Sequence, residues 1–184
     1  LRKHCDRFEL FRSNPAALYV HHNYHLSTVT GSKISYQLLT QTSKTQVGVE
    51  FRNENIISNK LGDTLSSPVK IEGSEGLFYM KGDNRFITNY FADQAFYFDR
   101  FSISGGFSYS YCSNFNGNWS YGIDVAYSLI DNVKIYSAIN RSFRNPTFTD
   151  LYYEGPSNVG NRALKPESAI TYEGGVKLDY KHLS

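Results

Sequence analysis

The chain from Phe101 onward alternates apolar residues with small or polar ones, and this alternation constrains the fold more than any other feature. In Phe101–Cys112, aromatic and aliphatic residues occupy most odd positions and serine occupies most even ones. Tyr121–Leu129 and Ile170–Lys181 repeat the pattern. Because side chains in a strand switch faces at every residue, these segments are predicted to be strands with one apolar and one polar face.

Eight segments have the composition or alternation of strands, and none shows a sustained helical period. They predict an all-β fold, an antiparallel up-and-down meander of about eight strands. The expected strands are Arg7–Arg12, Tyr24–Leu39, Thr45–Ser58, Arg85–Phe98, Phe101–Cys112, Ser120–Ile130, Val133–Arg144 and Ala169–Lys181.

The connections between these strands alternate in length. Since successive connections of a meander lie at opposite ends of the sheet, all short turns are expected at one end. Outer-membrane β-barrels have this asymmetry, whereas a soluble sandwich has no general reason for it. The pattern favours part of a transmembrane β-barrel with its apolar face toward lipid. The short turns are Thr40–Lys44, Asp99–Arg100 and Asp131–Asn132, and the longer loops are Ser13–Asn23, Asn59–Asn84, Ser113–Trp119 and Asn145–Ser168.

Composition agrees with a membrane interface and argues against several other classes. Aromatic residues make up 16% of the chain and include 15 tyrosines, which suit positions that are half wet and half apolar. The net charge of +2 gives no polybasic surface for nucleic acid. No apolar run approaches the roughly 20 residues of a membrane helix. The two cysteines, Cys5 and Cys112, lie far apart and suggest neither a disulfide framework nor a metal site.

Catalytic and metal-binding patterns are weak. The chain has no G-x-S-x-G, H-E-x-x-H or P-loop motif, so neither an enzyme nor a cofactor is expected. Of the clustered histidines, only His21 and His25 would share a strand face, and His22 would not; a solvated loop is the expected setting, and whether these side chains bind anything stays open. The loop carboxylates lack the dense spacing of a calcium loop; they are Asp63, Glu72, Glu75 and Asp83.

Five short elements follow one another between Ser142 and Gly175, and their order and spacing resemble the signature of TonB-dependent outer-membrane receptor barrels. The wording FRNPTFTDLYY is most similar to the cobalamin-receptor-like branch, although siderophore receptors share much of it. The elements are Phe143-Arg144-x-Pro146, Asp150-Leu151-Tyr152, Gly160-Asn161, Leu164-Lys165-Pro166-Glu167 and Tyr172-Glu173-x-Gly175.

This resemblance implies a place in a larger protein. Members of the family have a plug domain inside a barrel of 22 strands, and residues 1–184 contain no recognisable plug or TonB-contacting segment. We therefore expect residues 1–184 to be a partial receptor β-barrel, with the plug domain and remaining strands absent. The implied location is the outer membrane of a Gram-negative bacterium.

The resemblance also implies the partners. They are the lipid bilayer, the TonB complex through the full-length receptor, and a scarce small molecule such as cobalamin, another corrinoid or a ferric siderophore. No nucleic-acid partner is expected. An isolated segment would carry open edges, so we expect it to self-associate or to rearrange into a sandwich-like or smaller barrel form.

The residues of the signature have expected roles. Pro146 ends a strand, Asp150 caps or closes a turn, Leu151 packs at the loop base and Asn161 forms a tight turn. Glu167 and Glu173 are expected to pair with Arg or Lys. The candidate ligand-binding residues, on an extracellular loop, are Tyr152, Tyr153 and Asn158. The structural motif residues are Phe143, Arg144, Pro146, Asp150, Leu151, Gly160, Asn161, Leu164, Pro166, Glu167, Glu173 and Gly175.

Three alternatives remain open from the sequence. One is a small, complete eight-stranded outer-membrane barrel of structural or adhesive type. Another is a soluble all-β carbohydrate-binding module, which would be monodisperse without detergent. The third is a hydrolase on a β-scaffold, for which Asp124, Glu173 and Asp179 are the strand carboxylates, although nothing places two of them at the separation that a glycosidase needs.

Overall fold

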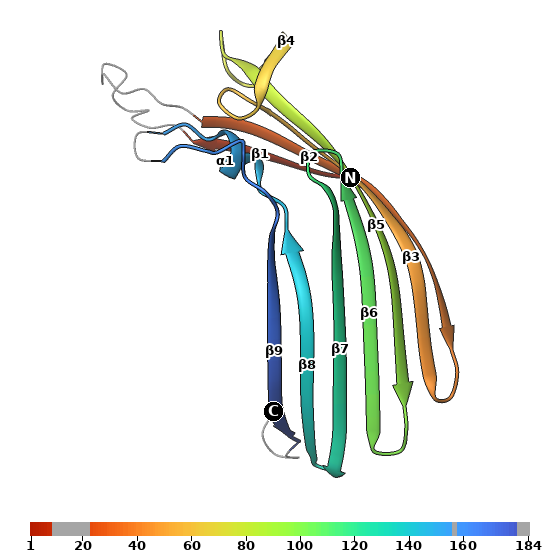
Figure 1. Cartoon of the computed structure of the whole chain (residues 1–184). Helices are drawn as coiled ribbons and strands as arrows, with labels where there is room; N and C mark the ends of the chain where they lie inside the picture. The colour runs from red at the N-terminus through yellow and green to blue at the C-terminus, as the bar shows by residue number, and fades with distance from the viewer. Residues whose placement is uncertain (9–22, 156–157, 180–184) are drawn as a thin grey trace. The chain divides into compact units, whose positions relative to one another are not determined.

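The computed structural model describes residues 1–8, 23–155 and 158–179. Over these residues, nine strands form one antiparallel sheet, which confirms the all-β meander (Figure 1). The strand order is β1-β2-β3-β5-β6-β7-β8-β9, and β4 pairs with β5 outside this path. The strands are β1 Arg2–Phe8, β2 Asn23–Leu39, β3 Ser43–Ser58, β4 Asp63–Lys70, β5 Phe78–Tyr97, β6 Phe101–Cys112, β7 Asn116–Ile130, β8 Val133–Arg144 and β9 Glu167–Leu178.

The predicted bounds hold best at β6 and β8, whereas β9 begins at Glu167 instead of Ala169 and ends at Leu178. Strands β6 and β8 begin and end at the predicted residues, whereas β5 begins at Phe78 instead of Arg85 and β7 at Asn116 instead of Ser120. Pairing explains the extension of β7, because Asn116 lies opposite Cys112 at the end of the β6 ladder. Ladder hydrogen bonds hold these polar residues in a strand that their composition does not predict.

The first strand begins five residues before the predicted start at Arg7. Strand β1 covers Arg2–Phe8 and pairs in register with β2, from Arg2 opposite Val29 to Phe8 opposite Asn23. Residues 9–12, which completed the predicted strand, lie outside the described residues. The sequence RKHCDRF carries charge on both faces, so its alternation is too weak to locate the strand.

A ninth strand lies within the connection predicted as a loop between Asn59 and Asn84. Strand β4 pairs with β5 from Asp63 opposite Gly82 to Lys70 opposite Phe78, and the register shifts between Thr64 and Val69. Pro68 lies inside this irregular stretch, where no ladder donor is required of it. Its proline and serines gave the segment the composition of a loop and concealed the strand.

The chain divides into two compact units, and each is described by itself. Unit 1 comprises residues 1–31, 52–86 and 145–165, and it holds most of the connections that were predicted to be long. Unit 2 comprises residues 32–51, 87–144 and 166–184, and it holds all three predicted short turns. The strands β2, β3 and β5 contribute residues to both units.

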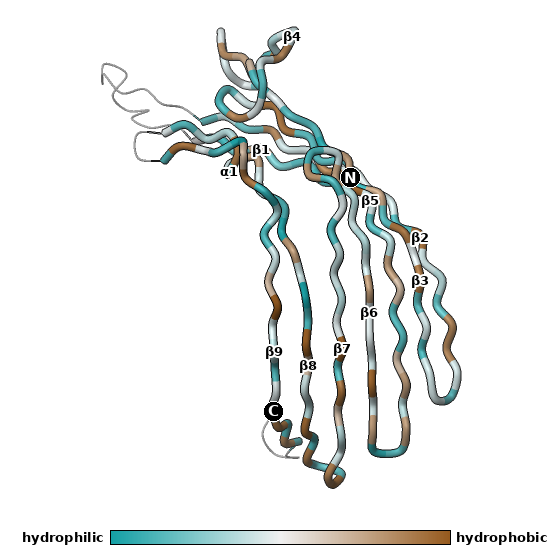
Figure 2. The backbone as a smooth tube through the Cα atoms, in the orientation of Figure 1, coloured by the Kyte–Doolittle hydropathy of each residue, from teal (hydrophilic) through white to brown (hydrophobic). Residues whose placement is uncertain are grey.

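Unit 2 has one apolar and one polar face, as the alternation predicts. Ile123 lies opposite Gly105 on β6 and Ile139 on β8, whereas Asp124 lies opposite Ser104 and Ala138. Hydrophobic and hydrophilic residues alternate along β6–β9 in Figure 2. The apolar face is exposed in the described residues; its large side chains include Phe107, Tyr121, Ile123, Tyr127, Ile135, Tyr172 and Val176. Such a continuous apolar surface indicates contact with lipid or with another protein.

Unit 1 contains a small core and the helix. Tyr24, Ile71 and Tyr79 are at most 4% exposed and pack with Leu26 and Ile57. The helix α1 covers Phe148–Tyr152. No helix among the described residues has the length and apolarity needed to cross a membrane.

Candidate functional site

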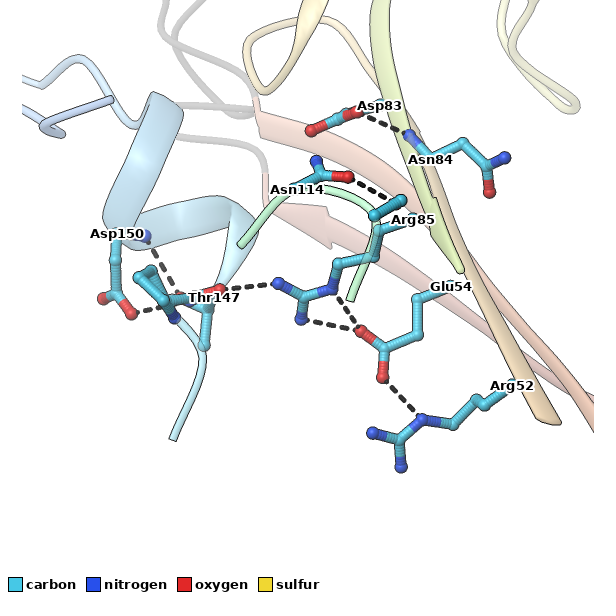
Figure 3. A network of polar contacts seen from close by, with 10 residues as sticks. Arg52, Glu54, Asp83, Asn84, Arg85, Asn114, Thr147 and Asp150 are labelled. Atoms are coloured by element: carbon cyan, nitrogen blue, oxygen red, sulfur yellow. Dashed lines mark hydrogen bonds and ion pairs between the residues drawn. The ribbon is translucent and has the colours of Figure 1, made fainter. Parts of the chain in front are cut away.

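The loop between β8 and β9 carries most of the sequence signature, and its first part is fixed by helix α1. Strand β8 ends at Arg144, and Pro146 follows. Thr147 and Asp150 form a capping box: the Thr147 Oγ1 accepts from the Asp150 amide at 3.1 Å, and Asp150 Oδ2 accepts from the Thr147 amide at 2.8 Å (Figure 3). Each bond satisfies an amide that the helix leaves unpaired at its start. Leu151 is 5% exposed, so the helix has a buried apolar anchor.

The second part of the loop returns against the same helix. The Gly160 amide donates to the Tyr153 carbonyl oxygen at 2.5 Å, and the Asn161 amide donates to the Asp150 carbonyl oxygen at 2.9 Å. A Cβ atom on Gly160 would lie 2.8 Å from the Leu151 carbonyl carbon and from the Tyr152 amide nitrogen, so only glycine fits this approach. The glycine therefore closes the loop onto α1.

A buried arginine attaches the loop to the sheet. The Arg85 side chain, on β5, donates from Nη1 to the Pro146 carbonyl oxygen at 2.6 Å, and its Nη2 lies 2.6 Å from Glu54 Oε2. Its guanidinium also lies over the ring of Phe148, 4.7 Å from the centroid. Glu54 on β3 bridges to a second cation, because its Oε1 is 3.0 Å from Arg52 Nε (Figure 3). Charge-assisted bonds of this kind are the strong ones, and here they join β3, β5 and the loop.

A second attachment lies at Tyr152. Its hydroxyl donates to Asp83 Oδ2 at 2.7 Å. Burial, and then the hydrogen bond to Asp83, raise the pKa of Tyr152 to about 12. The guanidinium of Arg162 lies 4.7 Å from the Tyr152 ring centroid, and its Nη1 is 2.5 Å from Asp63 Oδ1. Asp83 thus holds the hydroxyl of Tyr152, and Arg162 contacts its ring.

The three candidate ligand residues lie in this loop but are not equivalent. The hydroxyl of Tyr152 is already engaged by Asp83. Tyr153 is the residue that ends α1, and its amide donates to the Thr149 carbonyl oxygen at 3.0 Å. Asn158 is exposed, and its carbonyl oxygen accepts from the Gly155 amide at 2.8 Å. Among the described residues, no hydrogen bond involves the side chain of Tyr153 or that of Asn158.

The other motif residues lie at the start of β9 or within it. Arg144 Nη2 and Glu167 Oε1 are 2.8 Å apart, and both side chains are mostly exposed. Glu173 lies opposite Ala138, and no ion pair of the described residues includes it. The remaining members of the set are Phe143 opposite Ser168, Gly175 opposite Tyr136, Leu164 at 39% exposed, and Pro166 directly before β9.

No metal site emerges from the described part of the chain, where no group of three His, Cys, Asp or Glu side chains is arranged to hold an ion. His21 and His22 lie outside the described residues, and His25 Nδ1 is 2.7 Å from Ser58 Oγ. Both cysteines, Cys5 and Cys112, are free thiols.

The polar face of unit 2 is hollowed. A recess of about 560 Å³ lies over β5–β8 and is lined by polar groups, among them Asp93, Ser104, Asp124 and Asn140. Small residues make the room: a Cβ atom on Gly122 would collide with the Asn140 side chain. This face therefore presents polar groups, whereas the opposite one presents mostly apolar side chains.

The sequence did not predict the Arg85–Glu54 pair. Arg85 stood at the first residue of an expected strand, and Glu54 lay inside another. Their spacing of 31 residues carries no local signal. The local sequence indicated only that Glu50, Arg52 and Glu54 share one strand face.

The comparisons with known proteins agree with this architecture. Residues 5–184 match the family described as TonB dependent receptor-like, beta-barrel. No curated protein matches the chain. Eleven chains of solved structures match it.

Two of the matching structures are siderophore receptors of Pseudomonas aeruginosa. The ferric enterobactin receptor PfeA, in complex with enterobactin, is 17% identical over 91% of this chain, with a TM-score of 0.64. The siderophore receptor PirA is 18% identical over 87% of this chain, with a TM-score of 0.62. PirA from Acinetobacter baumannii is 14% identical over 89% of this chain, with a TM-score of 0.61.

The chain spans 26–28% of the length of these receptors, so the likeness concerns a part of each barrel. At such identities the structural matches support the fold. The family match covers nearly all of the chain and includes the whole signature from Phe143 to Gly175. The chain therefore belongs to the TonB-dependent receptor-like β-barrel family.

Proposed function

We propose that this chain forms part of the barrel wall of a receptor in the outer membrane of a Gram-negative bacterium, and that the complete receptor imports a scarce ligand with the TonB complex as its partner. One observation carries the proposal: the register of β6–β9 puts the apolar side chains on one face and the polar ones on the other. In a closed barrel, lipid covers the first face and the second lines the lumen. The role is in transport, and no catalytic step is assigned to the chain.

The ligand that we propose is a ferric siderophore. PfeA and PirA, which share the fold of this chain, are siderophore receptors. In this proposal the anchored loop presents Tyr153 and Asn158 to the ligand. The hydroxyl of Tyr152 is bound to Asp83, so Tyr152 positions the loop for the ligand rather than contacting the ligand itself.

The test uses the full-length receptor in its own cell. Deletion of its gene should abolish uptake of radioactive iron from a ferric siderophore such as ferric enterobactin, and loss of TonB should do the same. Uptake of labelled cobalamin should not change. If cobalamin uptake falls and iron uptake persists, the siderophore assignment is wrong.

A paired variant tests the loop residues. Replacing Tyr153 and Asn158 with alanine should weaken siderophore binding, because both side chains are available at the loop. The control is Asn132→Ala, at the short turn between β7 and β8, which should bind normally. Equal affinities in the two variants would remove Tyr153 and Asn158 from the binding site.

A further inference from the structure

One charged side chain, that of Arg141 on β8, lies on the apolar face of unit 2 where the registers of β5–β9 define it. Arg141 lies opposite Tyr121 on β7 and Ile170 on β9, and residues directly opposite each other point to the same face. Every other residue that these registers place on this face is uncharged. Tyr121 and Arg141 also border the polar recess, because the strand backbone is common to both faces.

The same registers give Arg141 no counter-ion on its own face. No ion pair of the described residues includes it, and its Nη1 donates to the carbonyl oxygen of Trp119. A guanidinium has five N–H donors, so this bond leaves most of them for a further partner. The carboxylates that the registers pair lie on the opposite face; they are Asp93, Asp124, Glu167 and Glu173.

Aromatic side chains surround this position on the apolar face. The Trp119 ring lies 4.3 Å from the Tyr109 ring and 4.7 Å from the Phe107 ring, measured between centroids. Phe107 is paired with Tyr121, which is the residue opposite Arg141. Trp119 is 49% exposed although it packs on two rings. Tryptophan and tyrosine collect at the headgroup level of membrane proteins, so the cluster favours that level for Arg141 as well.

The distance along β8 agrees with that level. Arg141 lies eight residues beyond Val133, where β8 leaves the short polar turn of Asp131 and Asn132. At about 3.4 Å per residue the separation is about 27 Å along the strand. A barrel strand tilted by about 40° would rise about 21 Å over this length, close to the height of about 25 Å of the apolar band. The guanidinium therefore lies near the second membrane interface if the turn lies at the first.

We propose that Arg141, with the aromatic cluster of Phe107, Tyr109, Trp119 and Tyr121, binds the phosphate group of a phosphorylated lipid in the outer leaflet. The guanidinium fork matches phosphate in two-point geometry, and it supplies the positive charge that this face otherwise lacks. The acyl chains continue along the apolar face past Ile123. The outer leaflet follows from the long β8–β9 connection, which begins three residues after Arg141, because long barrel loops are extracellular. The proposal rests on the proposed place of the chain in an outer-membrane barrel.

The experiment uses the full-length receptor, purified in dodecyl maltoside and titrated with dodecyl phosphate, with the bound fraction read by phosphorus NMR. Arg141→Gln should weaken binding about fivefold or more, since it removes one cation from the anion's contact. Arg141→Lys keeps the charge without the fork, so its affinity should fall between those of wild type and Arg141→Gln. The matched control is Arg144→Gln, on the opposite face of the same strand, which should bind as wild type does.

Each result decides a separate point. Wild-type affinity in Arg141→Gln, or equal weakening in Arg144→Gln, would overturn the site, and Arg141→Lys binding no better than Arg141→Gln would overturn the role of its charge. Inorganic phosphate binding as tightly as dodecyl phosphate would overturn the lipid assignment in favour of a free anion.

Two further measurements keep this proposal apart from the proposed function. Iron uptake should be unchanged in Arg141→Gln, because the side chain faces away from the barrel lumen. Loss of uptake in this variant would contradict that orientation. A spin label at residue 123 that makes no contact with lipid would overturn the membrane location itself, whatever the phosphate titration gives.

Discussion

The Arg85 guanidinium is the residue on which the loop attachment most depends. Its side chain is 10% exposed and contacts Glu54, the Pro146 carbonyl oxygen and the Phe148 ring. A buried cation is tolerated only with a partner for its charge, and removing that partner is more costly than the pair itself is favourable. Removing either Arg85 or Glu54 should therefore destabilise the fold by more than the intact pair stabilises it.

Replacing Glu54 with glutamine should loosen the loop. The change leaves the Arg85 charge buried without its carboxylate, at a cost of about 3–5 kcal/mol. We expect the amides of Thr147–Tyr153 to exchange hydrogen much faster, as measured by mass spectrometry on the full-length receptor. The control is Glu167→Gln, whose pair with Arg144 is mostly exposed and should contribute about 1 kcal/mol or less. Similar exchange in both variants would contradict the account.

Tyr152 gives a pH test at the same scale. Since its folded pKa is raised to about 12, the hydroxyl keeps its proton in the folded loop at pH values where an unfolded tyrosine has lost it. The stabilisation is thus complete below about pH 10 and disappears as the pH rises from about 10 to 12. Ultraviolet difference titration of wild type against Tyr152→Phe should show one tyrosine ionising near pH 12. If the tyrosine that the Tyr152→Phe change removes ionises near pH 10 instead, its hydroxyl is not buried against Asp83.

At the scale of elements, the loop is closed by local geometry. The capping box starts α1 at Thr147, and Gly160 lets the returning chain reach the helix backbone. Both devices act within about a dozen residues. Together they hold a five-residue helix that is far too short to be stable by itself.

Replacing Gly160 with alanine should displace the returning strand of the loop. A Cβ atom there meets backbone atoms of α1, which cannot move aside as a side chain could, so we expect a loss of about 1–3 kcal/mol. Limited proteolysis of the loop should become faster. In the control, Gly174→Ala, the added carbon lies 3.7 Å from the Tyr136 carbonyl oxygen, an ordinary contact. If Gly160→Ala resists the protease as the control does, the close approach is absent.

The elements predicted correctly are those that obey a local rule. Alternation located β6 and β8 to the residue, because both have one apolar and one small or polar face. Strand β4 was missed because Pro68 and its serines have the composition of a loop, and its pairing with β5 is a tertiary effect. The attachment of Arg85 to Glu54 and Pro146 is likewise tertiary, and no spacing rule could predict it.

At the scale of the whole molecule, the proposed place of the chain in a barrel wall follows from the difference between the two faces of the unit 2 sheet. The apolar face of unit 2 continues over four strands, and the polar face holds the recess lined by Asp93 and Asp124. Small residues such as Gly106 and Gly122 keep that recess open. This asymmetry could be predicted from the sequence alone, whereas the contacts within unit 1, such as those of Arg85, could not.

A charge placed on either face should have unequal effects. Lysine at Ile123, on the apolar face, should hinder membrane assembly of the full-length receptor by about 2–4 kcal/mol if the position lies near mid-bilayer. Lysine at Ser120, whose side chain lines the polar recess, should be tolerated. The yield of heat-modifiable receptor in outer-membrane fractions measures both. Equal yields would contradict a lipid-facing role for Ile123.

The most direct measurement is spin-label accessibility along β7 of the full-length receptor in lipid bilayers. Single cysteines at residues 121–127, in a background without Cys5 and Cys112, would carry the label. We predict a period of two: labels at 121, 123, 125 and 127 relax with oxygen dissolved in lipid, and labels at 122, 124 and 126 do not. Uniform accessibility, or oxygen contact on the Asp124 face, would contradict a barrel wall with its apolar face in the membrane.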